Sequence, residues 1–108
     1  MALRKSALRS SAKSRAGIVK AMAHPTRLLV MEALMDGELC VNDLTGFAEC
    51  DVTTLSKHLA VMKKAGLLVC EKRGLQVFYR IACPCFVEFF RCIDLIATTR
   101  DKRLSCAC

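Results

Sequence analysis

Several features that mark other classes of protein are scarce in this chain of 108 residues. Gly and Pro number only five and two, and 54% of the residues are hydrophobic, so a disordered or fibrous chain is excluded. No apolar run approaches the ~20 residues of a membrane span. No apolar segment follows the basic N-terminus, so we expect no secretory signal and no membrane partner. Two His residues are too few for a His-based zinc site. The length predicts one compact domain.

Acidic residues are missing from the chain until Glu32. The stretch before it carries seven basic residues: Arg4, Lys5, Arg9, Lys13, Arg15, Lys20 and Arg27. The remaining ten Lys and Arg are balanced by ten Asp and Glu, so the formal net charge of +7 belongs to the N-terminal segment. A basic arm on a neutral body favours nucleic acid or an anionic membrane surface as partner, although a solvated leader would explain the same charge. Residues 1–15 contain no aromatic anchor, which argues against the membrane.

Hydrophobic spacing and turn signals predict a mainly α fold with a small β-hairpin. Pro25 suits the first turn of a helix that Gly37 ends, and Asp51 is a good N-cap for another helix. The expected order is helices at 16–22, 25–36, 41–48 and 52–65, strands at 67–70 and 77–81 joined by a turn at 72–75, and a helix at 86–99. We therefore expect a flexible basic leader at residues 1–15, one domain at 16–99 and a Cys-containing tail at 100–108.

The helix after Asp51 has the pattern of a DNA-recognition helix. Leu55, Leu59 and Met62 recur at helical spacing and predict a buried face. At about 100° per residue, Thr53, Lys57 and Lys64 fall on the opposite face. Hydroxyl and ammonium groups there suit base edges and phosphates, although any solvated helix also carries polar residues. Two short helices, a tight turn and a following hairpin predict a winged helix-turn-helix.

Five short blocks follow one another along the chain: AHPTRL at 23–28, ELCV at 38–41, DVTTLSKHL at 51–59, KAGL at 64–67 and QVFY at 76–79. In these blocks, and over about residues 16–97, the chain resembles the ArsR/SmtB family of winged-helix repressors, which respond to metals or to thiol chemistry. The resemblance implies a homodimer, joined through the first and last helices, that binds double-stranded operator DNA without a cofactor and leaves it when an inducer binds.

The resemblance also suggests the DNA-contacting residues. The recognition-helix positions of the family match Thr53, Thr54, Ser56 and Lys57, its wing positions match Lys72, Arg73 and Gln76, and we add Lys64 from its place opposite the buried face. We interpret His58, on the flank of this helix, as a packed or hydrogen-bonded residue, and His24 as a helix-start residue.

Eight Cys without an export signal predict a reducing cytoplasm and free or metal-bound thiols. Arsenic-responsive relatives often carry Cys-Val-Cys-Asp-Leu-Cys at the third helix, and only Cys40 of that cluster is present here. Other thiols gather after the wing, at Cys83, Cys85 and Cys92, with Cys106 and Cys108 at the tail. We assign Cys83, Cys85 and Cys92 as candidate metal ligands, with Cys40, Cys106 and Cys108 as further candidates. Simple packing of Cys85 and Cys92 at an interface is the alternative.

Geometry limits how these thiols bind an ion. Cys85 and Cys92 lie about 10.5 Å apart along a straight helix, whereas two sulfurs on one ion lie within about 4.6 Å of each other. Either Cys83 folds back beside Cys85 and the partner chain supplies a third thiol, or the site is not trigonal.

A thiol-only ligand set favours As(III) or Sb(III) as inducer, then Cd(II) or Pb(II). The same thiols suit a repressor that senses oxidants or persulfides. A thiol-rich metal carrier is the alternative from another class, and it leaves the order of helices and hairpin unexplained. We expect no enzyme, because no nucleophile–base pair, phosphate loop or carboxylate dyad is recognisable.

Overall fold

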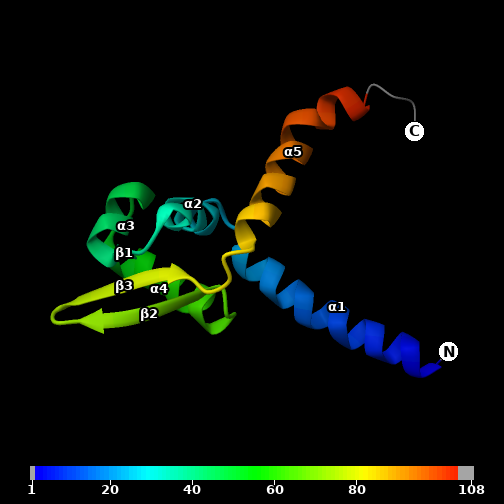
Figure 1. Ribbon diagram of the computed structural model, residues 1–108, viewed down its shortest axis with the longest axis horizontal. Coiled ribbons are helices and arrows are strands. Elements are labelled where there is room, and N and C mark those ends of the chain that lie inside the picture. The colour runs from blue at the N-terminus through cyan, green and yellow to red at the C-terminus, as the bar shows by residue number, and fades with distance from the viewer. Residues whose placement is uncertain (1, 105–108) are drawn as a thin grey trace.

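The computed structural model describes the backbone of residues 2–104 and the side chains of residues 2–100. Figure 1 shows a small body from which the first and last helices diverge. The elements are α1 (Ala2–Met22), α2 (Pro25–Ala33), the 3-10 turn η1 (Leu34–Asp36), β1 (Leu39–Cys40), α3 (Val41–Ala48), α4 (Val52–Lys64), β2 (Leu68–Arg73), β3 (Gln76–Ile81) and α5 (Phe86–Leu104). The predicted order of helices and hairpin is confirmed, and β1 is an addition that the sequence did not indicate.

The ends of α2, α3 and α4 follow from local chemistry. His24 caps α2 by accepting the Thr26 N–H at its Nδ1 atom, and Pro25 occupies the first turn, where no N–H is needed. Asp51 caps α4 by accepting the Thr54 N–H at 3.1 Å, as predicted. Between these helices Glu49 adopts the left-handed conformation at φ 50°, which ends α3 and turns the chain towards α4.

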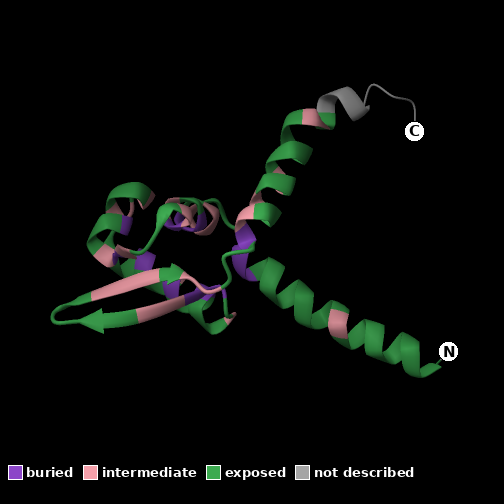
Figure 2. Ribbon diagram, viewed as in Figure 1, coloured by how far each residue is buried: buried purple, intermediate pink, exposed green. Residues whose placement is uncertain are grey.

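The hydrophobic core lies where α2, α3 and α4 meet the sheet. Its fully buried side chains are Val30, Met31, Leu44, Leu55, Leu59, Met62 and Leu68. The predicted inward face of α4 is confirmed, since Leu55, Leu59 and Met62 are at most 1% exposed. Figure 2 shows this buried centre within the body and exposed surface along most of α1 and α5.

The sheet has three antiparallel strands in the order β1-β3-β2. Leu39 pairs with Tyr79 of β3, and β3 pairs with β2 from Leu68 opposite Ile81 to Arg73 opposite Gln76. The predicted turn at 72–75 is therefore too long: pairing continues through Arg73, and only Gly74 and Leu75 connect the strands. Gly74 has φ 63°, which glycine adopts without the strain of a side chain.

Helices α1 and α5 are both longer than the sequence predicted. The first helix begins at Ala2 rather than at residue 16, so residues 2–15, expected as a flexible leader, are helical. Ala, Leu, Arg and Lys are strong helix formers, and no Pro interrupts them. The last helix extends past Thr99 into the expected tail, to Leu104. Residues 105–108, with Cys106 and Cys108, lie outside the described residues.

Candidate nucleic-acid interface

Helix α4 presents a polar outer face. Thr53, Ser56 and Lys57 are exposed there, opposite the buried Leu55 and Leu59. Thr54 is also exposed, but its N–H is held by the Asp51 carboxylate. The side chain of Thr54, and then its N–H, lower the pKa of Asp51. The cap thus fixes the first turn of α4 and leaves the side chains of the next turn available to a ligand.

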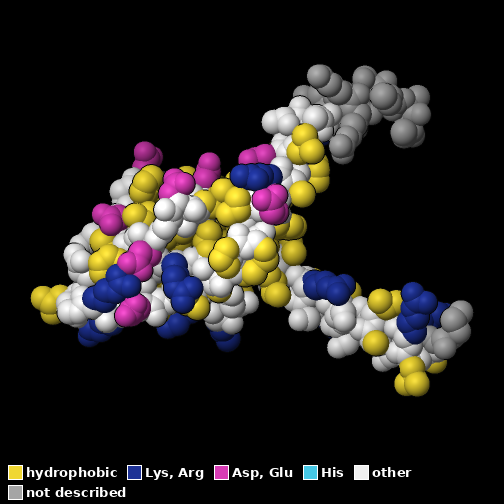
Figure 3. Space-filling model, viewed as in Figure 1, with side chains coloured by type: hydrophobic (Ala, Val, Ile, Leu, Met, Phe, Trp, Pro, Cys, Tyr) yellow, Lys and Arg dark blue, Asp and Glu magenta, His cyan; other side chains and the backbone are white. Residues whose placement is uncertain are grey.

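Charge is segregated around this helix. No acidic residue occurs in residues 2–31 or 52–70, which include all of α1 and α4. On the face drawn in Figure 3, acidic side chains lie mostly over the body and the start of α5, while the charged side chains of α1 are basic. The surface around α4 is therefore positive and suits a polyanion.

The three candidate residues of the wing are all exposed near its tip: Lys72, Arg73 and Gln76. Arg73 differs from the other two in having partners within the chain. Its guanidinium bridges Glu38, which precedes β1, and Glu71, which lies 2.8 Å away, and it also stacks on Phe78 at 4.8 Å. The two carboxylates raise the pKa of Arg73, and the arginine lowers the pKa of Glu38. Arg73 thus ties the wing to the segment before β1, a role that its place in the sequence did not indicate.

His58 is a packed, hydrogen-bonded residue, as predicted. Its Nδ1 accepts the Nε–H of Arg27 at 3.0 Å, and its ring lies 4.5 Å from the ring of His24 between centroids. Burial, then the charges of His24 and Arg27, lower the pKa of His58. His24, Arg27 and His58 thus join the start of α2 to the middle of α4. Sequence reasoning missed Arg27 because its partner lies 31 residues away.

The lowered pKa of His58 predicts that the chain loses stability in mild acid. The unfolded chain protonates His58 near pH 6.5, and the folded chain only at lower pH. Around and below that pH the unfolded state holds more protons at this site, so the free energy of unfolding should fall as the pH drops through about 6.5. Urea unfolding at several pH values measures it. A His58→Gln variant, which keeps an acceptor for Arg27, should show a flatter profile. An identical profile would exclude His58 as the titrating group.

Two of the candidate thiols come together where β3 leads into α5. Cys83 and Cys85 are exposed, and the interaction between their thiols lowers the pKa of Cys83 and raises that of Cys85. Cys92 is exposed farther along α5, and no group of three metal-binding side chains forms among the described residues. Cys83 therefore lies beside Cys85, as one part of the first arrangement requires; the third thiol from a partner chain stays a prediction.

Cys40 and two thiols without a predicted role lie in the body. Cys40 is buried and its thiol hydrogen-bonds to the Asp43 carboxylate at 3.2 Å. Cys50 packs against the core, and Cys70 of β2 lies beside Lys63, whose pKa it raises. All three are less exposed than Cys83 and Cys85, so the exposed pair is the better candidate for a ligand.

An apolar cavity of about 470 Å³ lies between α1 and the start of α5. Ile18, Val19 and Met22 line it from α1, Phe86 and Phe89 line it from α5, and both thiols of the pair open onto it. The thiol pair therefore lies where the two diverging helices meet the body.

Among the described residues, no helix is both long and apolar enough to cross a membrane.

A family model described as "Bacterial regulatory protein, arsR family" matches residues 24–69, from the cap of α2 into β2. The biofilm growth-associated repressor of Agrobacterium fabrum is 35% identical over 65 residues, which are 60% of this chain and 56% of that relative.

Two further relatives extend the likeness. An uncharacterized HTH-type transcriptional regulator of Methanocaldococcus jannaschii is 34% identical over 80 residues, 73% of this chain and 90% of the relative. A homodimeric winged helix-turn-helix DNA-binding domain from Mycobacterium bovis, described as a possible ArsR-family transcriptional regulator, superposes with a TM-score of 0.76 at 28% identity, over 93% of this chain and 90% of that one. The chain therefore belongs to the arsR family of bacterial regulatory proteins, which are DNA-binding transcriptional regulators and not enzymes.

Proposed function

We propose that the chain is a homodimeric repressor that binds operator DNA through α4 and the wing and leaves it when an inducer binds its cysteines. The observation that carries the proposal is the exposed face of Thr53, Ser56 and Lys57 on α4, a helix that itself contains no acidic residue beyond its N-cap Asp51. An α-helix with such a face fits the major groove, where hydroxyls and ammonium groups meet base edges and phosphates. Lys72 and Gln76 at the wing tip add contacts beside it, in the cytoplasm where operator DNA lies.

The second copy is proposed to cover the apolar surfaces of α1 and α5. Val19 is 51% exposed, Phe89 42%, Leu95 59% and Ile96 54%. Apolar side chains this exposed on two diverging helices are costly in water. A second copy would bury them and close the cavity between α1 and α5. The related Mycobacterium bovis domain is described as homodimeric, which supports the same assembly here.

As(III) or Sb(III) is our first choice of inducer. Both prefer thiolate ligands, and the structure supplies a pair, Cys83 and Cys85. A third thiol has to come from elsewhere, and Cys92 of the partner subunit is our candidate. The pair lies between the DNA-binding body and the helices proposed to form the dimer. Binding there would change the dimer geometry and hence the spacing of the two α4 helices. Cd(II) and Pb(II) are the next candidates.

A thiol-redox or persulfide sensor of the same fold is the second candidate function. The contact between Cys83 and Cys85 favours it, because two adjacent thiols can each give up a proton and together two electrons to an organic polysulfide, forming a disulfide. A metal carrier is less favoured, since it leaves the order of helices and hairpin unexplained.

The test begins with a duplex that the purified protein selects from random DNA. We expect a palindromic sequence with half-sites about one helical turn apart and an affinity that falls steeply with salt. As(III), Cd(II), Zn(II) and an organic polysulfide are then added in parallel, and DNA release is followed by fluorescence anisotropy. Release by As(III) supports the first choice, and release by polysulfide alone supports the second. Metal uptake without any selected duplex would support the carrier.

A further inference from the structure

A second hollow, which we call the basic groove, adjoins the apolar cavity, and Ile18 and Ala65 line both. It has a volume of about 560 Å³ and runs between α1, the start of α2 and the end of α4. Three of its lining residues are cations from three different helices: Lys20, Arg27 and Lys64. Of these, only Lys64 was predicted from the sequence to contact DNA.

Two hydrogen bonds orient the guanidinium of Arg27, which lines this groove. Its Nε donates to His58 Nδ1 at 3.0 Å, and its Nη1 donates to the carbonyl oxygen of Ala21 at 3.4 Å. A guanidinium has five N–H donors, so these two hydrogen bonds orient the group without using it up. The acceptors are a neutral ring and a backbone carbonyl, and they leave the positive charge of Arg27 uncompensated.

The positive charge of the groove is not neutralised by acids. Among the described side chains, ion pairs form at Arg73 and Arg91, and none involves Lys20, Arg27 or Lys64. The three helices contribute no acid to the groove, because the first acidic residue of the chain, Glu32, lies near the far end of α2. Three cations that line one groove with no acidic residue among its lining point to an anionic ligand.

We propose that the basic groove binds a backbone phosphate of the operator, on the side of α4 away from the wing. The proposal rests on the proposed DNA binding. Lys64 lies about 10.5 Å beyond Lys57 along the helix axis, and the major groove is about 12 Å wide. A helix reading bases near Lys57 therefore has its last turn close to a strand of the backbone. Each protomer would then hold the DNA on both flanks of α4, by the wing outside and by the basic groove on the side of α1.

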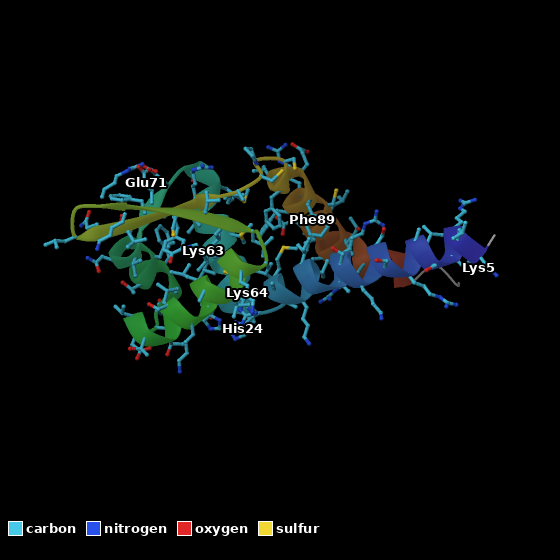
Figure 4. All side chains as sticks on the ribbon, turned by 90° about the horizontal axis from the view of Figure 1, so that it is seen from below. Lys5, His24, Lys63, Lys64, Glu71 and Phe89 are labelled. Atoms are coloured by element: carbon cyan, nitrogen blue, oxygen red, sulfur yellow. The ribbon has the colours of Figure 1, made fainter. Side chains whose placement is uncertain are left out.

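Lys63 offers a matched control for Lys64. It has the same charge and is its neighbour in the chain, but it faces Cys70 of β2. In Figure 4, Lys63 lies towards the strands and Lys64 towards α1 and His24. Removing either charge has a similar effect on the long-range field, so a difference between the two variants reports a direct contact. Arg27 is left unchanged because its loss would also disturb His58.

The experiment compares the salt dependence of operator affinity for the wild type, Lys20→Ala, Lys64→Ala and Lys63→Ala. The slope of log K against log salt should shrink by about 0.9 for each phosphate that the variant no longer neutralises, so by about 1.8 in a symmetric dimer. We expect this change for Lys20→Ala and Lys64→Ala and a clearly smaller one for Lys63→Ala. A duplex with uncharged methylphosphonates between the half-sites should bind the wild type more weakly and abolish the difference between wild type and Lys64→Ala.

Other results would overturn the proposal. Equal slopes for Lys63→Ala and Lys64→Ala would show that only net charge matters. Thermal stabilisation of the DNA-free protein by inorganic phosphate, absent in Lys20→Ala and Lys64→Ala while both still bind DNA normally, would make the groove a site for a free anion. Failure of the wild type to select any duplex would instead contradict the proposed function itself.

Discussion

Replacing Lys57 with Ala should weaken operator binding by roughly thirtyfold or more. A side chain that contacts a base edge contributes about 1–3 kcal/mol, and the substitution removes two such side chains from a symmetric dimer. Lys57 is exposed in the middle of the outer face of α4, where the helix would lie deepest in the major groove. It touches none of the core, so the fold and the dimer should be unaffected.

Anisotropy titration at fixed salt measures this weakening, and sedimentation checks that the dimer is intact. Lys63→Ala, on the same helix but beside Cys70, serves as the control and should retain most of the affinity. Thr53→Ala, one turn before Lys57, should alter the preferred duplex more than the overall affinity if the hydroxyl reads a base. Unchanged affinity in Lys57→Ala would remove this residue from the interface and shift the interaction to another part of the surface.

Replacing Cys85 or Cys83 with Ser should abolish the response to inducer while leaving operator affinity within about twofold of the wild type. Couplings between inducer and DNA are typically 5–150-fold in affinity, and the variants should lose all of this effect. The reason is local: both thiols are exposed at the start of α5, outside the core and far in the chain from α4, so their replacement removes a ligand without disturbing the DNA-binding face.

Two further variants place the site. Cys92→Ser should weaken the response if the partner subunit supplies the third thiol, and Cys50→Ser, a half-buried residue near the turn before α4, should respond as the wild type does. Cys40→Ser is the contrasting case. A normal response in the Cys83 and Cys85 variants together with no response in Cys40→Ser would move the sensor to the start of α3, where Cys40 now bonds to Asp43.

The parts of this molecule that were predictable depend on neighbours in the chain. The buried face of α4 follows from the spacing of Leu55, Leu59 and Met62, and its start follows from Asp51, whose cap reaches only three residues. The contact of Cys83 with Cys85 spans a single proline, and it was one of two arrangements the sequence allowed.

What escaped prediction depends on contacts between distant segments. Strand β1 has two residues, too few for a pattern, and exists because Leu39 pairs with Tyr79. The partner of Arg73 lies 35 residues away, so a guanidinium that belonged to the wing by sequence proved to be bound to Glu38. The same holds for Arg27 and His58, whose hydrogen bond shapes the basic groove. The length of α1 was missed because a charged, Ser-containing stretch is also typical of a flexible leader.

The divergence of α1 and α5 from the body has a consequence for how the chain folds. Outside the residues near their junction, these helices have little of the chain itself to pack against, and their apolar side chains remain open to water. If a second copy covers them, part of the folding free energy is supplied by association and follows the law of mass action. The melting temperature would then rise with protein concentration, and the protein would unfold at a lower temperature in dilute solution. The cellular amount of the regulator would thus set how much of it is folded, as well as how much of its DNA is occupied.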